Sequence, residues 1–182
     1  MKKLRSIIAG AAGVLFATLV LQAPANAQSN PKLSDAEIAS VAVVANQIDI
    51  DYAKIAKEKS KDAEVLEFAN MMAKDHQAVI DQAVALVTKL KVTPKENATG
   101  RQMQTDAEKT KKMLRSKSGS AFDKAYIDNE VAYHKAVISA VNGLLIPETE
   151  NAELKKLLQD VAPILQAHLE HAQMVQKQYK NK

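Results

Sequence analysis

Hydrophobic residues recur every three or four positions along most of the chain, which is the period of an amphipathic helix. The first stripe consists of Ile38, Val41, Ala45, Ile48, Tyr52 and Ile55. The second consists of Val65, Ala69, Met72, His76, Val79, Ala83, Leu86 and Leu90. The third consists of Ile127, Glu130, His134, Val137, Val141 and Leu144, and the fourth of Leu154, Leu157, Val161, Ile164, His168, His171 and Val175. No segment keeps the alternation of a strand, so we predict four long helices.

Capping residues and breakers predict where these helices begin and end. Ser34 lies three residues before Glu37, the spacing of a capping box, so the first helix begins there and fades in the charged stretch 57–61. The second helix is expected over 62–90. The stretch 120–123 is a second capping signature, from which the third helix runs to Leu145, before Pro147. The fourth helix is expected over 151–179, with a kink at Pro163.

The segment 91–119 is less regular and contains a shorter helical stretch over about 101–114. It is long enough to carry the chain from one end of a bundle to the other, so the third long helix can run parallel to the second. The pattern therefore predicts an all-α, ferritin-like four-helix bundle with a long crossover between helices 2 and 3 that contains a short extra helix. A simple up-and-down bundle is the alternative.

The first 27 residues have the pattern of a secretory signal peptide. Lys2, Lys3 and Arg5 precede an uncharged apolar stretch over 7–21, and the segment closes on Ala-Asn-Ala at 25–27. The apolar stretch is short for a membrane-spanning helix, which needs roughly 20 residues. We therefore expect cleavage after Ala27, a periplasmic or secreted location, and one helical-bundle domain over 28–182.

Charge and cysteine content narrow the function further. Three of the 25 Lys and Arg residues and none of the 21 Asp and Glu residues lie in the predicted signal peptide, which leaves 22 against 21. A nearly neutral domain without a basic, aromatic-interleaved run does not indicate nucleic-acid binding. The sequence has no cysteine, which excludes a lipid-modified cysteine and a disulfide framework. We expect no membrane anchor after cleavage.

All four histidines take positions that the stripes would otherwise assign to hydrophobic residues. Glu130 and His134 lie one turn apart on one face of the third helix, and His168 and His171 lie three residues apart on the fourth. If helices 2 and 3 are parallel, His76 and His134 lie at about the same level of the bundle. His168 is then expected about 10 Å nearer the end at which the third helix begins, given the 1.5 Å rise per residue.

Three aspartates flank the stripes and can join these histidines. Asp49 lies beside the first stripe, Asp75 beside the second, and Asp123 near the start of the third. Buried imidazoles and carboxylates must be paired or coordinate an ion. One interpretation is a structural polar layer that fixes the register of the helices. The other is a transition-metal site, for zinc, copper or iron, built from His76, His134 and His168 with help from Asp49, Asp75, Asp123, Glu130 or His171.

Several spaced motifs resemble one family of exported bacterial proteins. They are Phe68-Ala69 and Met72-Ala73-Lys74-Asp75-His76, then Phe122-Asp123-Lys124-Ala125-Tyr126-Ile127 with His134, then Pro163-Ile164-Leu165 with His168-Leu169. Together they cover nearly the whole chain after the signal peptide and resemble the domain of unknown function 4142 family, which is grouped with ferritin-like bundles. The resemblance implies a ferritin-like fold and an extracytoplasmic location, and it brings no established activity.

The sequence departs from ferritin-like di-iron proteins, which carry bridging glutamates and two Glu-x-x-His motifs. The residues three before His76 and His168 are Ala73 and Leu165, so a carboxylate-bridged di-iron centre and ferroxidase activity are not expected. From sequence alone we favour a non-catalytic exported bundle with a structural polar core, linked to stress by family association. The alternatives are a metal-binding protein, and a bundle that binds an envelope partner or a second copy of itself through a helix face or the crossover.

Overall fold

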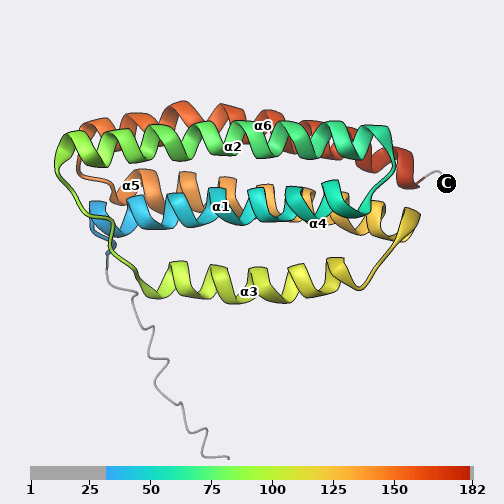
Figure 1. The fold of residues 1–182 in the computed structure, drawn as a ribbon. Helices are drawn as coiled ribbons and strands as arrows, with labels where there is room; N and C mark the ends of the chain where they lie inside the picture. The colour runs from blue at the N-terminus through green and yellow to red at the C-terminus, as the bar shows by residue number, and fades with distance from the viewer. Residues whose placement is uncertain (1–31, 181–182) are drawn as a thin grey trace, which may run out of the picture. The chain divides into compact units, whose positions relative to one another are not determined.

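The computed structural model describes residues 32–180 of the chain, so the predicted signal peptide and its cleavage point lie outside the described residues. Within 32–180 the chain is helical and contains no strand, as the hydrophobic period predicted. None of these helices combines the length and apolar character needed to cross a membrane. The described part is a bundle of long helices with one further helix along its side (Figure 1).

Four long helices form the bundle: α1 (Asp35–Lys59), α2 (Ala63–Leu90), α4 (Gly119–Ala140) and α6 (Ala152–Lys180). α1 and α2 are antiparallel neighbours, and so are α4 and α6 (Figure 1). α3 (Ala98–Arg115) carries the chain back along the bundle, so α4 runs in the same direction as α2. This arrangement confirms the ferritin-like bundle with a crossover.

The crossover helix α3 is longer than the stretch 101–114 that the sequence indicated, and it packs along α1. Ala107 and Leu114 are buried in this contact, with Leu114 fully so. Lys111 adds an ion pair with Asp51 of α1 at 3.4 Å. Burial of a leucine stabilises the contact by about 2 kcal/mol, so α3 is an integral part of the bundle.

The helix starts follow the capping rules at three of four positions. Ser34 and Glu37 form the predicted capping box, and Asp62 accepts hydrogen bonds from two amides of the first turn of α2. The side chain of Asn151 accepts hydrogen bonds from two amides at the start of α6. These side chains satisfy backbone donors that the first turn leaves free.

The capping signature predicted at 120–123 is wrong. α4 begins two residues earlier, at Gly119, after Ser118, whose side chain makes no capping bond. Gly119 has a φ of 55°, in the left-handed region that glycine enters without a steric penalty. The helix therefore starts where the glycine lets the backbone turn, and Ser120 lies inside its first turn.

The predicted end of the third long helix, Leu145, is also wrong. A π-helical segment, η1 (Val141–Leu145), follows α4, and α5 (Ile146–Glu148) continues the helical path. Pro147 lies in the first turn of α5, where a missing backbone N–H removes no hydrogen bond. The helical path is thus three residues longer than the proline suggested.

Two hydrophobic clusters fill the bundle, one at each end. The first is aromatic and tightly packed and includes Phe68, Phe122 and Tyr126, each fully buried. The second is aliphatic and includes Ile38 and Val161. The buried histidines belong to neither cluster. They form a polar layer along the length of the bundle.

The buried stripe of α6 differs from the predicted one at two positions. Ile164 is 40% exposed, whereas Leu165 is buried. Leu157 is half-buried and Leu158 takes the inward position beside it. Pro163 lies inside α6, as predicted. The stripe is rotated by about one residue in this part of the helix, while His168 and Val175 keep their predicted inward positions.

Candidate metal centre

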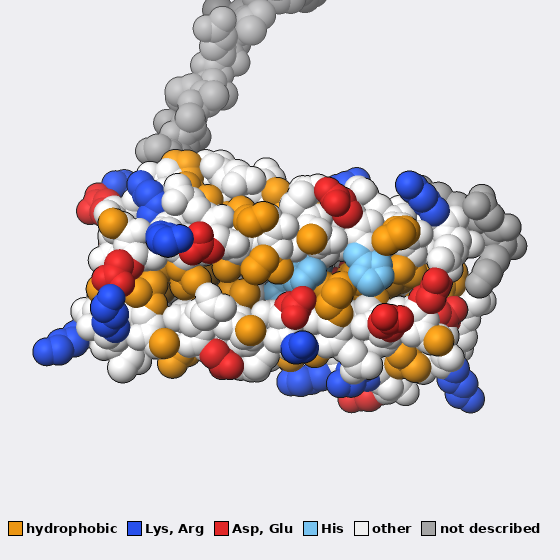
Figure 2. Space-filling view, turned by 90° about the horizontal axis from the view of Figure 1, so that it is seen from above, with side chains coloured by type: hydrophobic (Ala, Val, Ile, Leu, Met, Phe, Trp, Pro, Cys, Tyr) orange, Lys and Arg blue, Asp and Glu red, His pale blue; other side chains and the backbone are white. Residues whose placement is uncertain are grey.

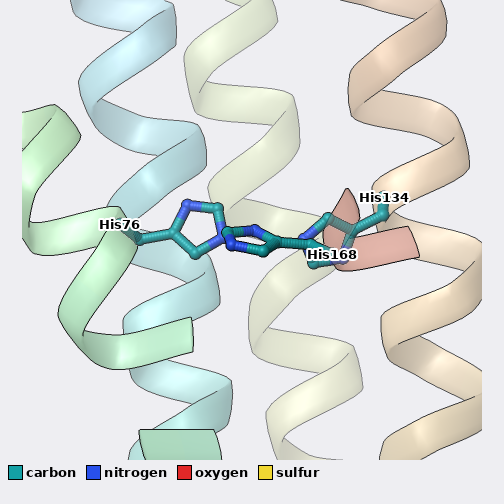
Figure 3. A group of neighbouring side chains, drawn as sticks. All are labelled: His76, His134 and His168. Atoms are coloured by element: carbon teal, nitrogen blue, oxygen red, sulfur yellow. The ribbon is translucent and has the colours of Figure 1, made fainter. Parts of the chain in front are cut away.

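Three histidines from three helices meet at one level of the bundle: His76 of α2, His134 of α4 and His168 of α6 (Figure 3). Their ring centroids lie 5.2 to 5.6 Å apart, and all three side chains are buried. The prediction that His168 lies about 10 Å from this level is wrong. Because the helical path continues to Glu148, 14 residues separate His134 from its end, against 16 from Ala152 to His168.

The ring of His76 is oriented by a residue of α1. Its Nδ1 lies 2.7 Å from Oδ1 of Asn46. The Asn46 amide group donates its N–H to the carbonyl of Ala42, so the oxygen faces the histidine. An amide oxygen can only accept, and His76 therefore carries its proton on Nδ1. The lone pair on Nε2, which has no hydrogen-bond partner among the described residues, faces inward.

The other two rings are fixed in the same way. His134 places Nδ1 3.0 Å from the backbone carbonyl of Glu130, and His168 places Nε2 3.1 Å from Oδ2 of Asp75. Both acceptors require the proton on the facing nitrogen. The remaining nitrogens, Nε2 of His134 and Nδ1 of His168, have no hydrogen-bond partner in the described part of the chain. Each ring thus presents one free lone pair.

Burial keeps the three rings neutral. It lowers the pKa of His76 well below its usual value, helped by the two neighbouring histidines. It lowers the pKa of His134 to about 4 and also lowers that of His168, although Asp75 acts in the opposite direction. Neutral imidazole is the form that coordinates a metal ion, so the site needs no deprotonation of histidine at neutral pH.

A carboxylate pair adjoins the histidines. Oδ2 of the fully buried Asp49 lies 3.5 Å from Nε2 of His76 and 3.7 Å from Nε2 of His134. Burial raises the pKa of Asp49 to about 7, and burial with the neighbouring Asp49 carboxylate raises that of Glu130 well above its usual range. Glu130 is therefore placed to share a proton with Asp49. The pair supplies an anionic ligand next to the three rings.

The spacing of these atoms is close to that of a metal site. One nitrogen from each of the three histidines, and separately one atom each from Asp49, Glu130 and His134, lie within 4.8 Å of one another. Three nitrogens around a tetrahedral ion at about 2.0–2.1 Å would be about 3.3 Å apart. Each nitrogen would need to move inward by less than about 1 Å, which small rotations of the rings provide.

The structure places the other predicted residues away from the centre of this cluster. Asp75 is about one-third exposed and contacts only the outer nitrogen of His168. Asp123 is buried seven residues from Glu130 along α4, about 10 Å away by helical rise. His171 is half-buried and packs edge-on against the ring of Phe68, with centroids 5.3 Å apart. Neither Asp123 nor His171 belongs to the groups that could hold an ion among the described residues.

Sequence reasoning missed Asn46. This residue is buried, and its side chain sets the proton position of His76. Its spacing of three residues from Asp49 on α1 was a readable signal, because residues three apart share a helix face. A polar residue beside a predicted ligand on the same face is where an orienting partner is expected.

Comparison with known proteins adds a family to this geometry. The sequence model of the domain of unknown function 4142 matches residues 20–175, most of the chain. This chain belongs to the DUF4142 family. A search of curated proteins finds no match. Membership of the DUF4142 family confirms the resemblance seen in the sequence, and the description of the family assigns no activity.

Among solved structures, the chain is similar to one described as CopM in the Cu(II)-bound form. The two share 19% sequence identity with a TM-score of 0.62, over 81% of this chain and 99% of that chain. At this identity the likeness concerns the fold. It shows that another helical protein has nearly the same arrangement as this DUF4142 member.

Proposed function

We propose that this protein binds one divalent transition-metal ion, zinc or copper, in the core of its bundle. Nε2 of His76, Nε2 of His134 and Nδ1 of His168 are the nitrogen ligands, and the Asp49 carboxylate is the fourth. Glu130 stands behind Asp49 and exchanges a proton with it as the ion enters or leaves. Three imidazoles and one carboxylate form a donor set suited to either ion.

The observation that carries this proposal is the orientation of the three rings. Each has its outer nitrogen bonded to an acceptor, which leaves an inner lone pair without a partner. A histidine that donates one N–H to a carbonyl or carboxylate and offers its other nitrogen inward has the arrangement of a metal ligand with its orienting partner. Finding it three times at one level is the strongest feature of the site.

A structural polar layer, the interpretation favoured from sequence, accounts for these groups less well. Such a layer requires buried donors and acceptors to satisfy one another. Here three ring nitrogens face one another as acceptors and none can donate to another. Apart from the proton that it can share with Glu130, Asp49 receives no hydrogen bond within the described residues. A cation is the group that satisfies all of them together.

The donor set does not fit a carboxylate-bridged di-iron centre. That centre takes a glutamate from each of two helices and a Glu-x-x-His pair from each of two others. In this bundle α2 and α6 supply histidine without glutamate, and only Asp49 and Glu130 are buried carboxylates next to the rings. A mononuclear, histidine-rich site agrees with these residues.

Two further points support the proposal or extend it. The similar structure was described with Cu(II) bound, which agrees with a metal-related role for bundles of this shape. We also propose that the protein works outside the cytoplasm, since residues 1–27 have the pattern of a signal peptide. An extracytoplasmic protein meets zinc or copper from the surroundings of the cell, where binding can serve buffering or protection.

The test is a titration of the chelator-treated protein with Zn²⁺ and, separately, Cu²⁺, followed by calorimetry. We expect one ion per chain, and a rise in Tm of the loaded protein. His76→Ala and His168→Ala should lower the affinity at least a hundredfold. His171→Ala is the matched control, because it removes a histidine of the same helix that lies outside the cluster. Equal affinity in His76→Ala and His171→Ala would refute the proposal.

A further inference from the structure

A large cavity opens from the histidine layer into the aliphatic end of the bundle. Its volume is about 390 Å³, and most of its wall is formed by aliphatic side chains of α1, α2 and α6, such as Ala39, Ala83 and Leu158. Small-molecule sites in proteins range from about 300 to 1,000 Å³, and a cavity of about 150 Å³ already accepts benzene. The volume therefore suits a ligand of more than one small ring.

The shape of the cavity is elongated. Its lining on α1 runs from Ala39 to Tyr52, and its lining on α6 runs from Leu154 to Leu165, each more than ten residues and so at least about 15 Å of helix. A branch reaches between α1, α3 and α4, where Met103 lines it. The molecule is visibly hollowed between rows of hydrophobic side chains on the face over α2 and α6 (Figure 2). A slender molecule fits this space better than a compact one.

Only one end of the cavity is strongly polar. Asn46, Asp49, His76 and His134 line it there. The groups that reach it without a hydrogen-bond partner are the Nε2 atoms of the two histidines and the oxygens of Asp49. These atoms are acceptors, and the side chains that carry them are more than nine-tenths buried. A ligand whose end reaches this point must present a hydrogen-bond donor.

We infer that the cavity binds a slender aliphatic molecule that ends in a hydroxyl group, with its chain along the apolar wall and its O–H donating to Nε2 of His76 or His134. A carboxylate head would meet the Asp49 and Glu130 oxygens and the imidazole lone pairs, all of which repel it. A charged ammonium head would have to leave water for a mainly apolar wall. The hydroxyl is neutral and supplies the single donor that the wall lacks.

This inference goes beyond metal binding and does not depend on it. In the metal-free protein the hydroxyl donates to an imidazole lone pair. The histidine His168 does not line the cavity, so the alcohol leaves that ring untouched. A protein that fails to bind metal can therefore still bind the alcohol, and the reverse also holds.

The test is calorimetry of the chelator-treated protein with 1-octanol as the probe. We compare it with 1-methoxyheptane, which has the same number of heavy atoms but no O–H, and with octanoate. The alcohol should bind about tenfold more tightly than the ether, as expected for one lost hydrogen bond to a buried acceptor, and more tightly than octanoate. Across hexanol, heptanol and octanol the affinity should rise about fourfold for each added CH₂.

Two neighbouring substitutions on α2 separate the cavity from the surface. Ala83→Phe places a ring in the cavity, whereas Val84→Phe places it on the outer face, where Val84 is 51% exposed. Ala83→Phe should lower the affinity for 1-octanol at least tenfold with helical content unchanged, and Val84→Phe should leave it as in the wild type. If Ala83→Phe does not fold, the chain-length series in the wild type decides the question.

Three results would overturn the inference. The first is the absence of binding by any of the alcohols, and the second is an affinity that does not change with chain length. The third is equal binding of 1-octanol and 1-methoxyheptane, which would show that the polar end plays no part. Equal binding by Ala83→Phe and Val84→Phe would place the alcohol outside the cavity.

Discussion

Replacing Asp49 by asparagine should make the metal-free protein more stable. Asp49 is fully buried, and burial raises its pKa from 3.8 to about 7. At pH 8 the carboxylate is ionised in both the folded and the unfolded chain, so the shift of about three units corresponds to about 4 kcal/mol of destabilisation. Asp49→Asn removes this cost and keeps the shape of the side chain. Its new N–H₂ group can also donate to Nε2 of His76, which lies 3.5 Å from Oδ2 of Asp49.

The sign of the pH dependence follows from the same pKa values. Between about pH 4 and 7 the folded chain keeps a proton on Asp49 that the unfolded chain has lost, so the stability of the wild type falls as the pH rises through this range. The advantage of Asp49→Asn should therefore be close to zero near pH 4, grow towards pH 7 and stay near about 4 kcal/mol above it. The assay is urea unfolding followed by circular dichroism at pH 4.5, 6 and 8, with chelator present.

Asp51→Asn is the matched control on the same helix. Asp51 is about one-third exposed and pairs with Lys54 and Lys111, so its substitution should change the stability by less than about 1 kcal/mol. Asp49→Asn should also weaken metal binding, because an amide is a poorer ligand than a carboxylate. A variant that is more stable yet binds less metal is expected where a residue is kept for function. An Asp49→Asn protein that is no more stable at pH 8, or that gains equally at every pH, would refute this reasoning.

Four other predictions follow from the structure. Nitrogen NMR of the metal-free protein at pH 7 should find His76 and His134 protonated on Nδ1 and His168 on Nε2, and any other pattern would contradict the hydrogen bonds described here. Asn46→Ala should lower the metal affinity ten- to a hundredfold in calorimetry through loss of the orienting bond, and an unchanged affinity would remove Asn46 from the site. The metal-free protein should lose stability as the pH falls from 6.5 to 4, because His134 binds its proton in the unfolded chain first. This loss, about 3 kcal/mol for His134 alone, should be absent in His134→Gln, as measured by urea unfolding. Leu114→Ala should destabilise the bundle by about 2–5 kcal/mol, and a smaller loss would mean that α3 adds little to the core.

Much of the fold was readable because local chemistry specifies it. The capping box at Ser34 sets the start of α1, and all six residues of the first stripe are buried, since a period of 3.6 residues leaves one face for the core. The direction of α4 followed from the length of the crossover. The start of α4 was misplaced because the left-handed backbone at Gly119, rather than a serine side chain, determines it.

The candidate site was readable in part. A stripe shows which way a side chain points, and so it identified His76, His134 and His168 as inward-facing. It does not show the level of a residue along the bundle, because that depends on the lengths of the helices and their connections. The π-helical segment η1 and the continuation through Pro147 moved His168 to the level of the other rings. The tautomers were beyond reach for the same reason, since they depend on partners in space such as Asn46.

The most direct test of the metal site is a crystal structure of the zinc-loaded protein with anomalous diffraction data. We predict one strong anomalous peak inside the bundle, within about 2.0–2.2 Å of Nε2 of His76, Nε2 of His134 and Nδ1 of His168, with an Asp49 oxygen completing the coordination. A zinc-loaded crystal without a peak between these three rings, or with zinc bound only at the surface, would contradict the account.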